Sequence, residues 1–206
     1  MKKLLLSVIC VIAVLTQANA QDKTFNFGLK MAPAISWLSI GEPGMEPNGA
    51  RMKFNWGFIG AWNFSDNFSL VSGFNINSLG GNYKYSTDVV TLPTELFPKN
   101  RIKYSEFQLP AIFQMRTNPI GDMRLHLQIG LAEGIMLSAR DIDDNKINNS
   151  VRNFNTAYIV AGGMEYQVLG ELNLLAQLKY NGGITKITKR GDVRNNFLEL
   201  ALGVIF

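Results

Sequence analysis

The sequence has almost no cysteine, and beyond its first residues it has no long apolar run. Cys10 is the only cysteine among the 206 residues, and it lies in the N-terminal apolar segment. A mature chain that lacks this segment therefore has neither a disulfide framework nor a thiolate metal site. No later apolar stretch reaches the roughly 20 residues that a membrane-spanning helix needs. If the chain crosses a membrane, we expect it to cross as a β-barrel.

The sequence also has little excess charge. The formal net charge is +4, and it falls to +2 once Lys2 and Lys3 are removed with the leader. No basic stripe is present, so we expect no nucleic-acid partner. There is no phosphate loop, dinucleotide fingerprint or zinc-ligand spacing either. We therefore expect no cofactor and assign no catalytic, cofactor-binding or metal residues.

The first 20 residues follow the plan of a secretory signal peptide. Two lysines open the chain, residues 4–15 form an apolar run, and 18–20 read Ala-Asn-Ala, a small-residue cleavage site. An uncleaved anchor is the alternative. We expect residues 1–20 to be removed and one domain to span 21–206. Export without cysteines suits the envelope of a Gram-negative bacterium.

The remaining chain is built from segments in which apolar residues recur at every second position. In the last segment Leu198, Leu200, Leu202, Val204 and Phe206 alternate with small or polar residues. Strand side chains alternate between two faces, so this spacing indicates strands with one apolar face and excludes a helix. The same alternation is found in segments 25–32, 55–64, 68–77, 106–116, 123–132, 158–167, 172–180 and 198–206.

The lengths of these segments and of their connections favour a membrane barrel. About ten residues are enough for a tilted strand to cross a bilayer core. Short connections at 65–67, 118–122 and 169–171 alternate with long loops, at roughly 38–51, 81–101, 138–153 and 182–195. Outer-membrane barrels have short periplasmic turns and long extracellular loops. We therefore predict an all-β fold, an eight-stranded antiparallel up-and-down transmembrane β-barrel with both termini on the periplasmic side.

The predicted inner face carries charges of both signs. Eight strands enclose an interior that side chains can fill, and buried charges are costly unless they are paired and hydrogen bonded. We expect a network of opposite charges inside the barrel, together with several Asn and Gln. Its members are Lys30, Glu106, Arg116, Arg124, His126, Glu165, Lys179 and Glu199.

Aromatic residues near the segment ends fit the belts that membrane barrels carry at both interfaces. These residues are Trp37, Trp56, Trp62, Phe64, Phe68, Tyr104, Tyr166 and Tyr180. One residue breaks the pattern, since Glu133 falls in the apolar phase of its segment. We interpret Glu133 and the neighbouring Gly134 as a bulge or as the end of the membrane band.

The sequence resembles the outer-membrane β-barrel family of the Bacteroidetes, whose members are also called PorT-like or porin family proteins. The likeness is carried by the opening strand 27–32, by the segment Tyr104 to Ile112 with its mid-strand Pro110, by glycine-rich strands, and by the terminal Phe206. It implies an integral outer-membrane barrel that the barrel-assembly machinery inserts, with Phe206 as the assembly signal. The protein-secretion role of one PorT protein is not implied.

Three further features of the sequence are candidates for a chemical or binding role. His126, the sole histidine, is a candidate general base, but no nucleophile motif accompanies it. Residues 141–145 begin like a calcium loop, yet Lys146 and Arg152 stand where Gly and Glu are needed. The loop 81–101 is apolar enough to pack over the barrel mouth or to form a contact surface, through Val89, Val90, Leu92, Leu96 and Phe97.

These observations predict a non-enzymatic outer-membrane barrel with a filled lumen and a structural, adhesive or accessory role through its extracellular loops. The alternatives are an outer-membrane lipid-modifying enzyme and a soluble, lipocalin-like carrier of an apolar ligand. We expect outer-membrane lipid and the assembly machinery as partners, with an extracellular or envelope protein as a further candidate.

Overall fold

The computed structural model describes residues 24–85, 101–147, 149–189 and 191–206. Within these ranges no helix is long and apolar enough to span a membrane. The strands are β1 Phe25–Ile40, β2 Met45–Pro47, β3 Arg51–Asn63, β4 Phe68–Tyr85, β5 Arg101–Arg116, β6 Met123–Arg140, β7 Phe154–Leu169, β8 Leu172–Gly183 and β9 Val193–Ile205.

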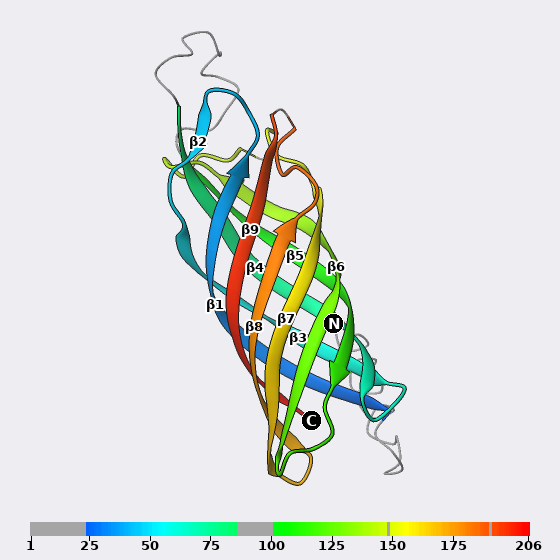
Figure 1. Cartoon of the computed structure of the whole chain (residues 1–206). Helices are drawn as coiled ribbons and strands as arrows, with labels where there is room; N and C mark the ends of the chain where they lie inside the picture. Colours follow the sequence, from blue (N-terminus) through cyan, green and yellow to red (C-terminus); the bar gives the residue numbers. More distant parts are fainter. Residues whose placement is uncertain (1–23, 86–100, 148, 190) are drawn as a thin grey trace, which may run out of the picture.

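Eight of these strands close into an antiparallel barrel (Figure 1), and the short β2 is attached to β4 alone. The first and last strands pair with each other and close the sheet. The N–H of Phe206 donates to the carbonyl of Phe27 over 2.7 Å, and the N–H of Phe27 donates back over 3.2 Å. A closed barrel leaves no row of unpaired backbone groups, as hydrocarbon requires. The predicted eight-stranded barrel is confirmed.

Connections of different length are sorted to the two ends of the barrel, as predicted. The short turns 64–67, 117–122 and 170–171 lie at the end where the chain terminates, and the longer connections lie at the other (Figure 1). The long connections are shorter than expected, however, because β1, β4 and β6 continue for several residues beyond the predicted segments. On β4 and β6, polar residues enter the outward phase there while backbone pairing continues, so apolar alternation alone misses these extensions.

The outer surface of the barrel is apolar in the phase that the sequence predicts. Leu200 and Leu202 are each about half exposed, and Ala201 between them is fully buried. Near the short turns the outward rings of Trp62, Phe64 and Phe68 are in contact. One predicted belt residue is wrong: Tyr104 is 4% exposed and faces the interior, because it shares the inward phase of Glu106 on β5.

Of the two interpretations of Glu133 and Gly134, a bulge or the end of the membrane band, the bulge is wrong. Glu133 pairs in regular register with Leu109 and Thr156, and its carboxylate accepts a hydrogen bond from the Thr156 hydroxyl on the outer face. The register instead shifts opposite the step from Ser105 to Glu106, so that Leu137 is the extra residue of β6. The hydroxyl of Thr156, on the neighbouring strand β7, accommodates the charge of Glu133. The sequence of β6 alone cannot reveal this partner.

Candidate functional site in the barrel interior

The interior at the long-loop end is filled by apolar side chains. Strand residues and loop residues contribute together: Leu38, Leu79 and Ile102 come from the walls, whereas Val151 and Ile187 come from the loops. Each of these five side chains is at most 2% exposed. We call this cluster the apolar plug; it comprises Ala34, Leu38, Met45, Leu79, Tyr83, Ile102, Tyr104, Ala139, Val151, Ile187, Val193 and Phe197.

Below the plug, two lysines share one carboxylate. Lys179 and Glu199 are direct partners in the register of β8 and β9, and Lys179 Nζ lies 2.7 Å from Glu199 Oε1. Lys30 of β1 donates to the same oxygen over 2.9 Å, and Asn55 donates to Oε2 over 2.8 Å. All four side chains are nearly or fully buried. A buried carboxylate with three donors is satisfied, which is the condition for keeping it charged in an interior.

A second carboxylate balances the charge at this level. Glu106 on β5 accepts hydrogen bonds from Asn77 over 2.9 Å and from Asn155 over 2.8 Å, and the charge of Lys179 also acts on it. Two lysines and two glutamates therefore occupy the middle of the barrel. The inward Gly134 makes this arrangement possible, since a Cβ there would lie 2.8 Å from the Glu106 carboxylate.

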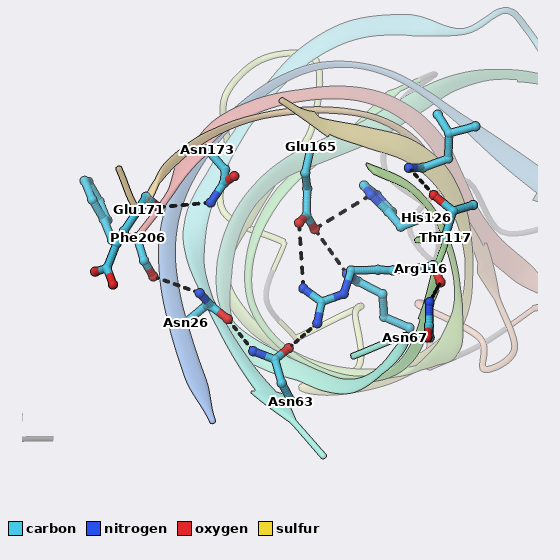
Figure 2. Close-up of polar contacts among 12 residues, drawn as sticks. Asn26, Asn63, Asn67, Arg116, Thr117, His126, Glu165, Glu171, Asn173 and Phe206 are labelled. Carbon is cyan, nitrogen blue, oxygen red and sulfur yellow. Dashed lines mark hydrogen bonds and ion pairs between the residues drawn. The ribbon is translucent and has the colours of Figure 1, made fainter. Parts of the chain in front are cut away.

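A further polar group lies toward the short turns (Figure 2). Arg116 Nη1 and His126 Nδ1 each lie 3.8 Å from a carboxylate oxygen of Glu165. Gln114 donates to Glu165 over 3.2 Å and itself accepts from Gln128 over 2.6 Å. These side chains come from three neighbouring strands, β5, β6 and β7, so the hydrogen bonds tie the walls together.

The polar network continues to the end of the chain. Arg116 Nη2 donates to Asn63 over 2.6 Å, and Asn63 in turn donates to Asn26. Asn26 donates to the backbone carbonyl of Phe206 over 3.2 Å (Figure 2). The closure of β1 against β9 is thereby linked to the interior charges.

A cavity of about 540 Å³ occupies the interior at the short-turn end. Residues of the turns, among them Ser65, Asp66 and Glu171, line it, so it opens at that end, and it reaches up to Lys30 and Lys179. No residue of the apolar plug lines it. The expectation of a filled lumen therefore describes the long-loop half, whereas the other half holds a polar vestibule.

All eight residues of the predicted interior network point inward, and seven of them form two groups. Lys30, Glu106, Lys179 and Glu199 gather in the middle, and Arg116, His126 and Glu165 gather nearer the turns. Arg124 lines the cavity near Arg116 without an ion pair among the described residues.

The predicted loop surface formed by Val89, Val90, Leu92, Leu96 and Phe97 lies outside the described residues. Sequence reasoning missed the apolar plug. Its signal was present, since Ile102 and Tyr104 continue the inward phase of Glu106 beyond the membrane segment.

The interior offers hydrogen bonding and charge compensation, and its histidine is enclosed. His126 is 3% exposed, is not among the residues that line the cavity, and lies against Gly163, where a Cβ would be 2.8 Å from Nε2. The calcium-like segment is closed on itself, because Asp141 accepts hydrogen bonds from the N–H groups of Asp143 and Asn145, each over 2.9 Å. Across the described ranges no three His, Cys, Asp or Glu side chains are grouped so that they could hold a metal ion.

Comparison with known proteins decides the family. A family model described as "Outer membrane protein beta-barrel domain" matches residues 17–189, most of the chain. This protein belongs to the outer-membrane β-barrel domain family. No curated protein matches it.

Solved structures of outer-membrane barrels are similar to it in fold. Neisserial surface protein A superposes with a TM-score of 0.54 at 15% identity, covering 87% of this chain and 95% of that chain. OprG, an outer membrane protein from Pseudomonas aeruginosa, gives 0.52 at 8% identity, covering 88% and 95%. At such identities the likeness shows the fold alone. Family and fold together support placement in the outer membrane.

Proposed function

We propose that this member of the outer-membrane β-barrel domain family is a non-enzymatic surface protein of the PorT-like, Bacteroidetes type. It is exported by a signal peptide, inserted with Phe206 as the assembly signal, and acts through its extracellular end in an adhesive, structural or accessory role. The lumen holds the polar network that links the strands, and it conducts no steady ion current.

The apolar plug is the observation that carries this proposal. A channel needs a continuous wet path, whereas Leu38, Ile102 and Phe197 are each at most 2% exposed at the level where that path would run. Tyr83 and Leu79 fill the same level from β4. Burial of these side chains also stabilises the barrel, by about 1.5–3 kcal/mol for each large apolar group.

Order in the extracellular loops supports a role at the cell surface. The connection after β6 is joined to the connection after β8, because Arg152 N–H donates to the carbonyl of Ile187 over 2.8 Å and Lys189 N–H donates to that of Ser150 over 3.0 Å. Val151 and Ile187 then anchor both loops in the plug. A preorganised surface loses less conformational entropy on binding than a free loop does.

Two experiments test the proposal. Purified protein in planar bilayers is expected to give no large, steady conductance, and a stable open channel would overturn the proposal that the lumen is closed.

The second experiment tests the surface role. The variant Lys146→Glu with Lys189→Glu reverses two exposed loop charges, and we expect it to reduce adhesion of cells that display the protein. The matched control, Asp66→Lys with Glu171→Lys, reverses two charges at the short turns and is expected to leave adhesion unchanged. Equal behaviour of the two variants would argue against a loop-borne role.

A further inference from the structure

Basic side chains of β5 and β6 gather on the outer face of the barrel near the long loops, and two from β3 approach them. On β5 and β6, Lys103 and Arg140 are direct partners in the register, and Arg101 follows two residues from Lys103. On the other side of β4, Arg51 and Lys53 of β3 have the inward phase, opposite the buried Ser36 and Ala34 of β1. They approach the same group from inside the barrel wall because β3 and β4 stop pairing beyond Asn55 and Asn77. We call Arg51, Lys53, Arg101, Lys103 and Arg140 the basic cluster.

Contacts within the cluster show that these cations are close together. Arg51 and Arg101 both donate to the side-chain oxygen of Asn82, over 3.3 Å and 3.2 Å. Burial lowers the pKa of Lys53, and the charges of Arg51, Lys103 and Arg101 lower it further. Like charges at this spacing repel one another, so the cluster is stabilised by any anion that comes between them.

The described acids do not balance the cluster. Asp144 pairs with Lys103 over 3.0 Å, and its side chain is 63% exposed. The nearby Glu46 is paired with Lys84 over 3.1 Å, outside the cluster. Within the described ranges, five cations therefore face the exposed carboxylate of Asp144, which pairs with Lys103. Natural surfaces that keep such an excess are commonly sites for anionic groups.

The surface directly below the cluster has the order of a lipid leaflet. Phe107 of β5 is flanked in register by Ile76 and Ile135, and its ring stacks on Phe74 at 5.7 Å. Two residues farther along the strand comes a row of hydroxyls, formed by Ser78, Ser105 and Ser138. After another two residues come Lys103 and Arg140.

Each step of two residues corresponds to about 6.6 Å along a strand. Along the strand, the side chains are therefore apolar, then hydroxyl-bearing, then cationic. The outer leaflet has the same order, with acyl chains, then the polar linkage, then phosphates. The apolar side chains Met52, 80% exposed, and Phe54 continue the acyl-facing surface along the edge of the cluster on β3.

We propose that the basic cluster is a binding site for the phosphate groups of an outer-leaflet lipid. The acyl chains lie on the aromatic surface around Phe107, the serine row faces the polar linkage, and the cluster holds the phosphates. The site rests on the outer-membrane placement of the barrel and is independent of its role in adhesion.

The test uses the full purified barrel in detergent with bisphosphorylated lipid A as the probe, and bound lipid is counted by native mass spectrometry. The triple variant Arg101→Gln, Lys103→Gln, Arg140→Gln is expected to bind the probe at least about tenfold more weakly than the wild type. The control Lys186→Gln, Lys189→Gln, Arg194→Gln removes the same charge from the connection after β8 and from β9. It is expected to bind like the wild type.

Two arms with the wild-type protein keep the proposal open to refutation even if a variant fails to fold. Dephosphorylated lipid A is expected to bind at least about tenfold more weakly than the bisphosphorylated form. Equal binding of both lipids, or equal binding by the wild type and a folded triple variant, would overturn the proposal. Displacement of the lipid by an equal concentration of inorganic phosphate would also overturn it, since the site would then select free phosphate. Heat-modifiable gel migration reports folding separately, so failure of the barrel and failure of the site are distinguishable.

Discussion

Gly73 of β4 lies opposite Pro110 of β5, where the pairing of the two strands is interrupted. The ladder is regular at Val71 with Ile112 and again at Asn75 with Gln108, and it is missing between them. Pro110 has no N–H to donate. Gly73 has a φ of 133°, and a Cβ there would lie 2.2 Å from the carbonyl oxygen of Phe58. The glycine thus provides the local bend that accommodates a proline in the middle of a barrel strand.

Replacement of Gly73 by alanine is expected to destabilise the barrel. The backbone conformation is one that other residues rarely adopt, and the added methyl group collides with β3, so we expect a loss of about 1–3 kcal/mol in the free energy of unfolding. Urea unfolding in lipid vesicles measures it. Gly162→Ala is the matched control, because its Cβ would meet its nearest neighbour, Leu127 Cδ2, at an ordinary 3.4 Å. Equal stability of the two variants would contradict the explanation.

Removal of the Glu199 carboxylate alone is expected to lower the free energy of unfolding more than removal of Glu199 together with its partner Lys179. Glu199→Gln leaves Lys30 and Lys179 facing each other without their shared carboxylate, and breaking a buried pair in this way costs about 3–5 kcal/mol. The double variant Lys179→Met, Glu199→Gln removes one of the stranded charges and is expected to be more stable than Glu199→Gln alone. A double-mutant cycle of unfolding free energies checks this, and additive effects would show that the two groups are not coupled.

Spin labels on β9 are expected to distinguish lipid from protein on the outer face. With single cysteines introduced into the cysteine-free mature chain, labels at positions 200 and 202 should be relaxed by lipid-soluble oxygen and protected from a water-soluble nickel reagent. A label at 201, where the side chain is buried in the interior, should be protected from oxygen by comparison. Strong relaxation of the labels at 200 and 202 by the aqueous reagent would contradict a membrane-embedded barrel.

Asp144 is expected to titrate at unusually low pH. Its hydrogen bond with Lys103, and then the charge of that ammonium group, lower its pKa from the ordinary value of 3.8. Because the folded-state pKa is depressed, the ion pair stabilises the loop above the unfolded pKa, and this contribution is lost as pH falls through the folded pKa. Carboxyl NMR shifts follow the titration, and Lys103→Gln should move the midpoint upward toward 3.8.

Replacement of His126 is expected to leave the lipids of the cell unchanged. Its ring is enclosed among interior side chains and does not line the cavity, so it lacks the access that a general base needs. Mass spectra of lipid A and phospholipid from cells with the wild type and with His126→Gln should coincide. A lipid species that depends on His126 would instead support the lipid-modifying alternative.

Much of the fold could be read from a single periodicity. Apolar residues at alternate positions, as in Leu198 to Phe206, placed each strand and assigned its outer face, and the spacing of short and long connections gave the order of the strands. The same phase placed all eight charged or titratable interior residues on the inner side. A period of two is a local property of extended chain, so one strand carries it without its neighbours.

Partners across strands required the closed structure. Lys30 and Lys179 share Glu199, and Thr156 hydrogen bonds Glu133. These contacts depend on the register of the strands, which is set by pairing between segments far apart in sequence. The bulge at Leu137 was missed for the same reason. The inward position of Tyr104, in contrast, follows from the phase that it shares with Glu106 on β5.

The amino-acid sequence by itself therefore determined which face of each strand is directed toward lipid and which toward the barrel interior. Tertiary structure alone decided that the long-loop half is sealed by the apolar plug, that the other half is open, and that five cations from β3, β5 and β6 meet beside β4. The physical reason is that side-chain direction follows from the backbone of one strand, whereas a contact depends on how closure and stagger bring separate strands to the same level.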